Sequence, residues 1–256
     1  LPGKSRKNTL IRDQKVQESR PLFQNRVKKS ILLKVSKRKL KKLLILWKRR
    51  ISTGIKMRLE KWFPTVFYYG LYPHINIDIL TKFCYDVKSK DQGRKWTNIS
   101  NSYQSNDLNL ETPELKSLIE TANKNFLVLH KELGYKDDLL PIIDNMWINI
   151  NPPGGMSKLH KHVDNILSGV FYLQCPENCG NIVFPNPVSN AAYHFHHKNL
   201  KEFNENNSSF YHQVAQRSKM IVFPSYAEHY VEPNLSNKDR ISISFNTKLI
   251  HRSNND

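Results

Sequence analysis

The sequence predicts a mainly β domain with supporting helices, preceded by a basic N-terminal arm. Two observations lead to this fold class. Apolar residues recur at helical spacing in the first half of the chain. Short β-branched and aromatic runs, separated by Gly, Pro, Asn and Ser, fill the second half. This order favours a jelly-roll, cupin-like core, that is a double-stranded β-helix, with helices supporting one face.

The first half of the domain is predicted to hold one strand and two helices. Residues 63–69 are aromatic and β-branched, as strands are. Residues 75–87 and 112–133 have helical periodicity, and the second of these segments has a broad apolar face. These helices are the elements that we expect to cover the sheet.

The second half is predicted to be built from strands. They cover residues 146–150, 166–173, 181–184, 219–223 and 241–246. The Asn- and His-rich stretch 189–213 interrupts this series, and we expect it to form a loop near the mouth of the barrel.

The charge is concentrated in residues 1–60, which hold 20 Lys and Arg against 3 acids, whereas residues 61–256 hold 20 against 19. The sequence therefore predicts an arm over 1–60 and a separate domain over 61–256. Within the arm, residues 1–27 are expected to be disordered. Residues 28–58 are expected to form an amphipathic helix with a stripe of Leu33, Leu40, Leu44, Trp47 and Ile51.

Three roles for this basic helix stay open. It can pack its apolar stripe on the domain, bind the phosphates of a nucleic acid, or lie on an anionic membrane or a partner protein. All three need an amphipathic stripe, so the pattern does not separate them. The oligomeric state has no signature in the sequence.

Three cysteines, Cys84, Cys175 and Cys179, are too few for a disulfide framework, and reduced thiols in a cytoplasmic protein are the simpler interpretation, in the host cytoplasm if the protein is viral. The run Leu43–Trp47 is far shorter than the roughly 20 residues of a membrane span. No transmembrane segment is therefore expected.

Four residues in the last third suggest chemistry: His162, Asp164, His229 and Arg240. Two imidazoles and one carboxylate are the ligands of the facial triad of non-haem Fe(II) oxygenases. His162 and Asp164 are two residues apart, so in extended chain both side chains point to one face. Each residue alone is explained as well by an ordinary surface position, and it is the combination that indicates a metal site.

Arg240 begins a strand that alternates between two faces. Ile241, Ile243 and Phe245 share the apolar face, and Arg240 shares the other face with Ser242, Ser244 and Asn246. A buried guanidinium needs a partner. The far carboxylate of a dicarboxylate cosubstrate would be such a partner, with Ser242 donating a second hydrogen bond.

Residues 62–249 resemble the 2-oxoglutarate/Fe(II)-dependent oxygenases found in phages, marine bacteria and cyanobacteria. The resemblance lies in ordered segments: Trp62-Phe63-Pro64-Thr65, Ser100-Asn101-Ser102-Tyr103-Gln104-Ser105, Trp147-x-Asn149, His160-Lys161-His162, Leu167-Ser168-Gly169-Val170-Phe171-Tyr172-Leu173, Phe223-Pro224-Ser225, His229 and Arg240-Ile241-Ser242-Ile243-Ser244-Phe245-Asn246. The basic arm lies outside it.

The resemblance implies a dioxygenase that hydroxylates an unidentified substrate while 2-oxoglutarate is decarboxylated to succinate. It implies Fe(II), 2-oxoglutarate and O2, with His162, Asp164 and His229 as metal ligands. Arg240, Ser242 and, more weakly, Tyr172 would bind the cosubstrate. His160 is an alternative metal ligand, or a residue that contacts and orients the ligands. A non-catalytic binding module on the same fold, with the arm holding nucleic acid or an assembly partner, is the rival interpretation.

Overall fold

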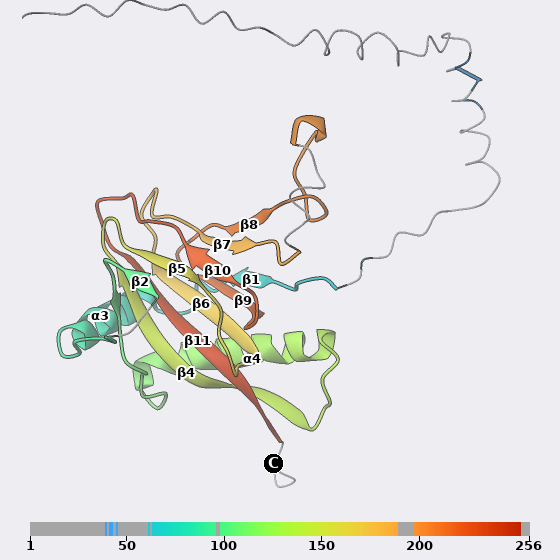
Figure 1. The fold of residues 1–256 in the computed structure, drawn as a ribbon. Helices are drawn as coiled ribbons and strands as arrows, with labels where there is room; N and C mark the ends of the chain where they lie inside the picture. The colour runs from blue at the N-terminus through green and yellow to red at the C-terminus, as the bar shows by residue number, and fades with distance from the viewer. Residues whose placement is uncertain are drawn as a thin grey trace, which may run out of the picture. The chain divides into compact units, whose positions relative to one another are not determined.

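The computed structural model describes residues 63–95, 98–188 and 197–251, together with Lys39, Lys41, Lys42, Ile45 and Lys61 (Figure 1). The chain divides into two units, Leu1–Trp62 and Phe63–Asp256. In the first unit, Lys39, Lys41, Lys42 and Ile45 are helical. The remainder of the helix predicted for 28–58, and the disorder predicted for 1–27, lie outside the described residues.

The described residues of the second unit include two helices, α3 and α4, and a short helical turn that precedes α4. Helix α3 spans Ile77–Lys88 and is capped by Asn76, whose side chain accepts a hydrogen bond from the Ile79 amide at 3.1 Å. The turn η1 (Pro113–Leu115) leads into helix α4 (Lys116–Glu132). None of the described helices is long and apolar enough to cross a membrane.

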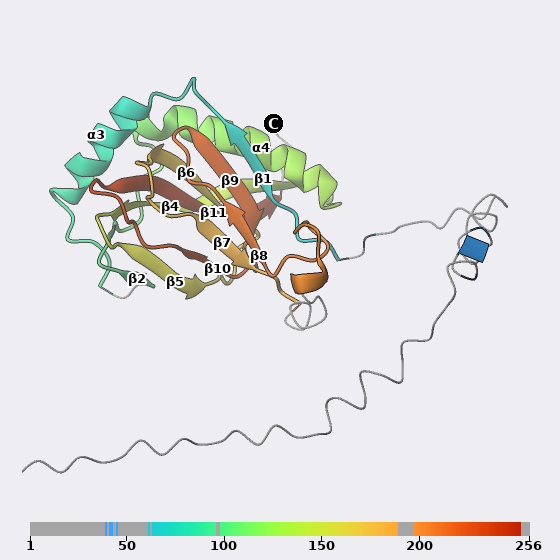
Figure 2. The same ribbon diagram turned by 90° about the horizontal axis from the view of Figure 1, so that it is seen from above.

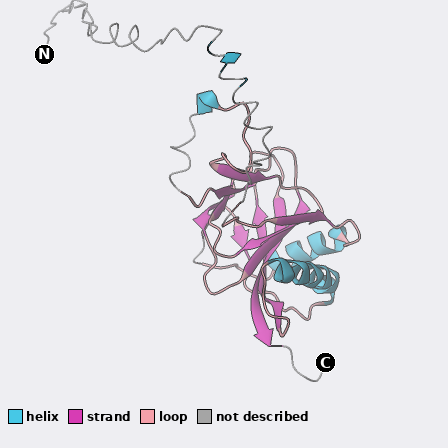
Figure 3. Ribbon diagram, turned by 90° about the vertical axis from the view of Figure 1, so that its right-hand side faces the viewer, coloured by secondary structure: helices cyan, strands magenta, loops and turns pink. Residues whose placement is uncertain are grey.

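Two antiparallel sheets make up the rest of the unit, which confirms the prediction of a mainly β domain. The six-stranded sheet has the order β1-β9-β6-β11-β4-β3, and the five-stranded sheet has the order β2-β5-β10-β7-β8. The two sheets are seen in Figure 3 as crossing layers of strands. We call them the major sheet and the minor sheet.

The strands differ greatly in length between the sheets. The major sheet contains β1 (Tyr68–Leu71), β3 (Tyr103–Gln104), β4 (Leu139–Asn151), β6 (Leu167–Gln174), β9 (Lys219–Pro224) and β11 (Arg240–His251). The minor sheet contains β2 (Ile99–Ser100), β5 (Met156–His160), β7 (Ile182–Pro185), β8 (Phe210–Gln213) and β10 (His229–Val231). A short turn, η2 (His197–Asn199), precedes β8.

The helices cover the outer face of the major sheet, as Figure 2 shows for α3 and α4. The larger apolar core lies between them: Leu118, Phe126 and Leu80 of the helices pack with Ile243 and Phe245 of β11. A second, smaller cluster includes Val170, Tyr172, Phe184 and Phe223, from strands of both sheets. The inner face of the major sheet therefore carries apolar side chains on β6 and β9 and polar side chains on β11.

Strand β11 divides its side chains as its alternation predicts. Ile241, Ile243 and Phe245 are fully buried in the larger core. The alternate residues Arg240, Ser242, Ser244 and Asn246 line a cavity on the other face. The predicted strand at 63–69 begins later than expected, at Tyr68, where pairing with Val222 of β9 starts.

Candidate metal centre and cosubstrate pocket

Three histidines converge at the inner end of the minor sheet. His160 is the last residue of β5, His162 follows two residues later, and His229 is the first residue of β10. The antiparallel pairing of β5 with β10 sets His229 opposite His160. One nitrogen from each ring lies within 4.8 Å of the other two, so the three residues form a group that could hold a metal ion.

Backbone carbonyls orient two of these rings. The Nδ1 atom of His160 lies 2.7 Å from the Lys158 carbonyl, and the Nδ1 atom of His229 lies 2.9 Å from the Ala227 carbonyl. A carbonyl oxygen only accepts, so Nδ1 must carry the proton in both rings. The Nε2 lone pairs are then free, and such a contact behind a ligand is the usual way of fixing an imidazole for a metal.

Burial keeps the cluster in the neutral form that binds metals. Desolvation lowers the pKa of His229 to about 3 and that of His162 to about 4, and it also lowers the pKa of His160. Repulsion from the neighbouring imidazolium adds to the effect at His162 and His229. The three nitrogens therefore offer lone pairs at neutral pH.

Asp164, the predicted carboxylate ligand, does not join this cluster. Its side chain is exposed, and neither the group of converging ligands nor the cavity lining includes it. The backbone of Asp164 has a φ of 63°, in the left-handed region, so the strand alternation that carries His160 and His162 to one side has ended. The structure brings together His160, His162 and His229 instead.

A cavity of about 580 Å³ opens beside the three rings. Its floor is the polar face of the major sheet, and the lining includes Trp147, Asn149 and Asn151 of β4 and Arg240, Ser242, Ser244 and Asn246 of β11. The two strands are paired so that Ser242 lies opposite Asn149 and Arg240 opposite Asn151. The described residues that line the cavity include three cations, Arg94, Lys161 and Arg240, but no acid.

Arg240 is 1% exposed at the closed end of this cavity. Its Nη1 atom donates to the carbonyls of Cys179 and of Glu232, the latter at 3.1 Å. Within the described part of the chain, Nη2 is buried without a hydrogen-bond partner. Burial lowers the pKa of the guanidinium from its ordinary value. A buried cation with a free donor in a cavity is a fitting site for a carboxylate.

Ser242 and Tyr172, the other predicted cosubstrate residues, also line the cavity. They are opposite one another in the pairing of β11 with β6, and both are buried. Desolvation raises the pKa of Tyr172, so its hydroxyl remains protonated. Two hydroxyl groups therefore lie on the same floor as the guanidinium.

The metal side of the cavity contains Trp147, which the family resemblance includes, and Arg94, which the sequence did not single out. The ring centroid of Trp147 lies 5.7 Å from that of His162, and its indole nitrogen is buried without a partner. The Arg94 guanidinium stacks 5.3 Å from the centre of the indole ring, and it also pairs with Asp107 at 2.5 Å. Arg94 precedes Trp147 by 53 positions in the sequence, and no local sequence pattern predicts this contact.

A hydrogen-bonded row of amides stiffens the floor. The Gln104 amide donates to Asn149 at 3.0 Å, and Asn149 donates in turn to the Ser244 hydroxyl at 2.9 Å. Gln104 and Asn149 belong to the segments quoted for the family resemblance. Their side chains satisfy one another, so the buried donors without a partner in the described lining belong to Asn98, Trp147 and Arg240.

Comparison with known proteins agrees with this geometry. Residues 145–246 match the family model described as "Putative 2OG-Fe(II) oxygenase". The match begins within β4 and ends within β11, so it contains the histidine cluster and Arg240. None of the curated proteins compared with the chain matches it.

Solved structures show the fold. A prolyl-4-hydroxylase from Pseudomonas putida is 14% identical, with a TM-score of 0.51, covering 74% of this chain and 94% of that one. The carbocyclase SnoK from nogalamycin biosynthesis is 12% identical, with a TM-score of 0.53, covering 73% and 82%. The epimerase SnoN, solved with Fe3+, alpha ketoglutarate and nogalamycin RO, is 9% identical, with a TM-score of 0.53, covering 74% and 82%.

The name of the matching family implies iron and 2-oxoglutarate. The donors of this site suit both, because they offer neutral imidazoles for the metal and a buried guanidinium for a dicarboxylate. The predicted double-stranded β-helix is confirmed by the two sheets and by the structural neighbours. Over residues 145–246 the chain is thus similar to the 2-oxoglutarate/Fe(II)-dependent oxygenases, as its motifs predicted.

Proposed function

We propose that the domain hydroxylates a C–H bond of its substrate at a metal held by His160, His162 and His229. The observation that carries this assignment is the convergence of three neutral imidazoles beside a cavity whose closed end holds a free guanidinium donor. The ligand set differs from the predicted one in that His160 takes the place of Asp164. Three neutral ligands leave the full charge of the divalent ion to be balanced by the cosubstrate.

The cosubstrate would lie along the floor of the cavity. The far carboxylate of 2-oxoglutarate would pair with Nη2 of Arg240, and the hydroxyl groups of Ser242 and Tyr172 would donate to the same end. The 2-oxo acid end would then point towards the histidines. When bound, Fe(II) and 2-oxoglutarate supply the oxidative decarboxylation to succinate and CO2, with transfer of one oxygen atom of O2 to a substrate C–H bond.

The remaining lining residues position and shield the reaction. Trp147 covers His162 with its ring, and its N–H is free to donate to an oxygen atom of the cosubstrate or the substrate. Arg94 holds the indole in place from the other side. With Arg94 and Lys161 at the cavity and no acid among the described lining residues, a substrate with carbonyl or carboxylate oxygens suits the site better than a cationic one.

The test is metal-dependent formation of succinate from 2-oxoglutarate by the purified chain under air. We expect turnover with Fe(II), no turnover with His229→Ala, and undiminished turnover with His251→Ala, an exposed histidine at the far end of β11. Succinate formation that is equal in His229→Ala and the unaltered protein would refute the assignment.

For the basic arm, binding of a polyanion stays a prediction from the charge of residues 1–60. If the arm binds nucleic acid, deletion of these residues should abolish a salt-dependent affinity for DNA or RNA, because that affinity comes from phosphate contacts. An affinity that survives the deletion would exclude the arm as the binding element.

A further inference from the structure

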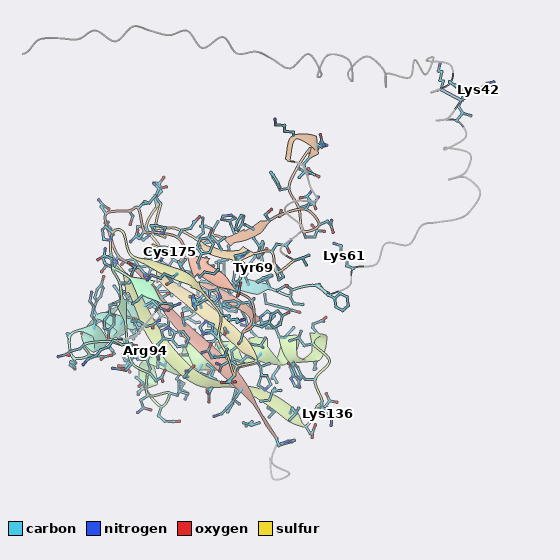
Figure 4. All side chains as sticks on the ribbon, viewed as in Figure 1. Lys42, Lys61, Tyr69, Arg94, Lys136 and Cys175 are labelled. Atoms are coloured by element: carbon cyan, nitrogen blue, oxygen red, sulfur yellow. The ribbon has the colours of Figure 1, made fainter. Side chains whose placement is uncertain are left out.

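Two cysteines meet beside the closed end of the cavity. Cys175 directly follows β6, and Cys179 ends the turn that leads towards β7. The Cys179 amide donates to the Pro176 carbonyl at 3.2 Å, and Asn178 has a φ of 61°, so the chain reverses within this turn. Both residues are free thiols, and Cys175 is labelled in Figure 4. Cys179 belongs to the smaller apolar cluster and Cys175 packs against the same cluster, while the Cys179 thiol donates to the Gly180 carbonyl at 3.8 Å.

Two buried cations flank this dithiol. The positive charge of Arg240 lowers the pKa of both thiols, and that of Lys219 lowers the pKa of Cys175. Lys219 is 8% exposed, its ammonium donates to the Gln213 side chain at 2.6 Å and to the Val214 carbonyl at 3.1 Å, and it lies 4.9 Å from the centre of the Tyr69 ring. Both of these acceptors are neutral. The positive charge is therefore available to stabilise a thiolate nearby.

The pKa values of the two thiols are shifted in opposite directions. The interaction with Cys175 lowers the pKa of Cys179, and Arg240 lowers it further, while burial opposes the change. The interaction with Cys179 and burial raise the pKa of Cys175. The thiolate is therefore favoured at Cys179, and the thiolate is the form of a cysteine that reacts with peroxides.

The turn with Cys179 is also part of the support of Arg240. The Cys179 carbonyl accepts from Nη1 of Arg240. At the next residue, Gly180, an added Cβ would lie 3.0 Å from Nη1 and 2.7 Å from the Glu232 carbonyl. The turn is packed tightly against the guanidinium. A movement of the Cys179 backbone must therefore displace the Arg240 side chain or break its hydrogen bond.

We propose that Cys175 and Cys179 form a peroxide-sensitive dithiol, and that its closure to a disulfide weakens the binding of 2-oxoglutarate. The second half of this inference rests on the proposed role of Arg240. The two sulfur atoms must approach to about 2.05 Å in a disulfide. Strand β6 is held by β9 and β11 on its two sides, whereas Glu177 and Asn178 in the turn are exposed. The turn therefore moves, and the Cys179 carbonyl moves with it.

The reaction consumes one peroxide and no other oxidant. The Cys179 thiolate attacks one oxygen atom of hydrogen peroxide, the O–O bond breaks, and the sulfenic acid forms as hydroxide leaves and takes up a proton. The sulfur of Cys175 then attacks the sulfenic sulfur and loses its proton, the S–O bond breaks, and a second water leaves. Two electrons pass from the sulfur atoms to the peroxide. Cys175 is partly exposed, which gives a small oxidant a route to the pair.

The experiment uses the full chain loaded with Mn(II), which avoids reactions of iron with peroxide. Hydrogen peroxide is added in small excess, free thiols are counted by alkylation and mass spectrometry, and 2-oxoglutarate affinity is measured by calorimetry. We expect loss of the Cys175 and Cys179 thiols only, with Cys84, which is fully buried in the larger core, still reduced. The affinity should fall about tenfold, the effect of one weakened charged hydrogen bond, and dithiothreitol should restore it.

Cys175→Ala is the matched control, because it removes one sulfur and leaves the Cys179 carbonyl in place. It should bind 2-oxoglutarate as the reduced protein does, with no response to peroxide. A protein whose Cys175 and Cys179 stay alkylatable overturns the dithiol, and a disulfide without a change of affinity overturns its coupling to Arg240. If the reduced protein does not bind 2-oxoglutarate, the proposed function and the coupling fall together, whereas the thiol count still decides the dithiol.

Discussion

The metal ligands and the cosubstrate anchor are carried by different sheets, and the two sheets are built differently. Arg240 and Ser242 stand on β11, a 12-residue strand paired along its length with the 13-residue β4. His160 and His229 stand on β5 and β10, of five and three residues. The cosubstrate anchor, Arg240 and Ser242, is thus held by a long strand pair that packs on the apolar core. The metal cluster is held by a few paired residues at the ends of short strands.

This difference predicts that the two halves of the site can be disabled separately. A substitution in the minor sheet should remove the metal and leave the anchor intact. A substitution at Arg240 should do the reverse.

The largest effect is expected at the ambiguous ligand. His160→Ala should lose Fe(II) binding and reduce succinate formation to the background level, because the cluster loses one of three nitrogens. Asp164→Ala should retain both, because its side chain is exposed and outside the cavity lining. Anaerobic Fe(II) titration by calorimetry measures the difference. The reverse pattern would restore the His162, Asp164 and His229 set predicted from the sequence.

The sequence could not decide this point, and the reason is geometric. His160, His162 and Asp164 are spaced two apart, so in an extended chain all three share one face. What separates them is where the strand stops, at His160, and the left-handed backbone at Asp164. Both depend on the pairing of β5 with β10, 69 positions away in the case of His160 and His229.

The major sheet was far more predictable. The alternation of residues 240–246 identified which side chains of β11 face the cavity and which face the core, because both faces of this strand are covered and each has its own composition. The contact of Arg94 with Trp147 could not be foreseen, since Arg94 lies outside any helix or strand. Long strands and helices have a periodic sequence pattern that predicts them, whereas the positions of irregular segments depend on tertiary contacts.

The second prediction concerns the anchor. Arg240→Met should weaken 2-oxoglutarate binding by about 2–5 kcal/mol, the penalty for leaving a buried charge without its partner. Fe(II) affinity should be unchanged, because the guanidinium is not part of the histidine cluster. Arg240→Lys should recover part of the loss. Calorimetry with each ligand separately measures both effects, and a parallel loss of metal binding would mean that the two sheets do not act independently.

The third prediction tests the packing behind the anchor. A Cβ at Gly169 of β6 would lie 2.1 Å from the Phe245 ring on β11. Gly169→Ala should lower the free energy of unfolding by about 1–3 kcal/mol, as overpacking in a core does. The double variant with Phe245→Leu should recover part of this loss, because the smaller side chain leaves room for the methyl group. Urea denaturation measures the stability, and additive losses in the double variant would contradict the contact.

The smallest expected effect is a loss of stability of the metal-free protein as the pH is lowered. His229 is 4% exposed, and burial lowers its pKa to about 3 in the folded state, against 6.5 for an ordinary histidine. Between these values the unfolded chain binds a proton that the folded chain does not, so stability must fall as the pH falls below 6.5. The slope from this one group approaches about 1.4 kcal/mol per pH unit.

Urea denaturation of the metal-free protein at pH 7, 6 and 5 can isolate this contribution. His229→Gln has no titratable group at this position, so its stability should decline less steeply than that of the unaltered protein over the same range. Arg240→Met, on the other sheet, should leave the slope as it is. Identical slopes for the unaltered protein and His229→Gln would mean that the ring is not held neutral by burial, and the minor sheet would then contribute no more pH sensitivity than the major sheet does.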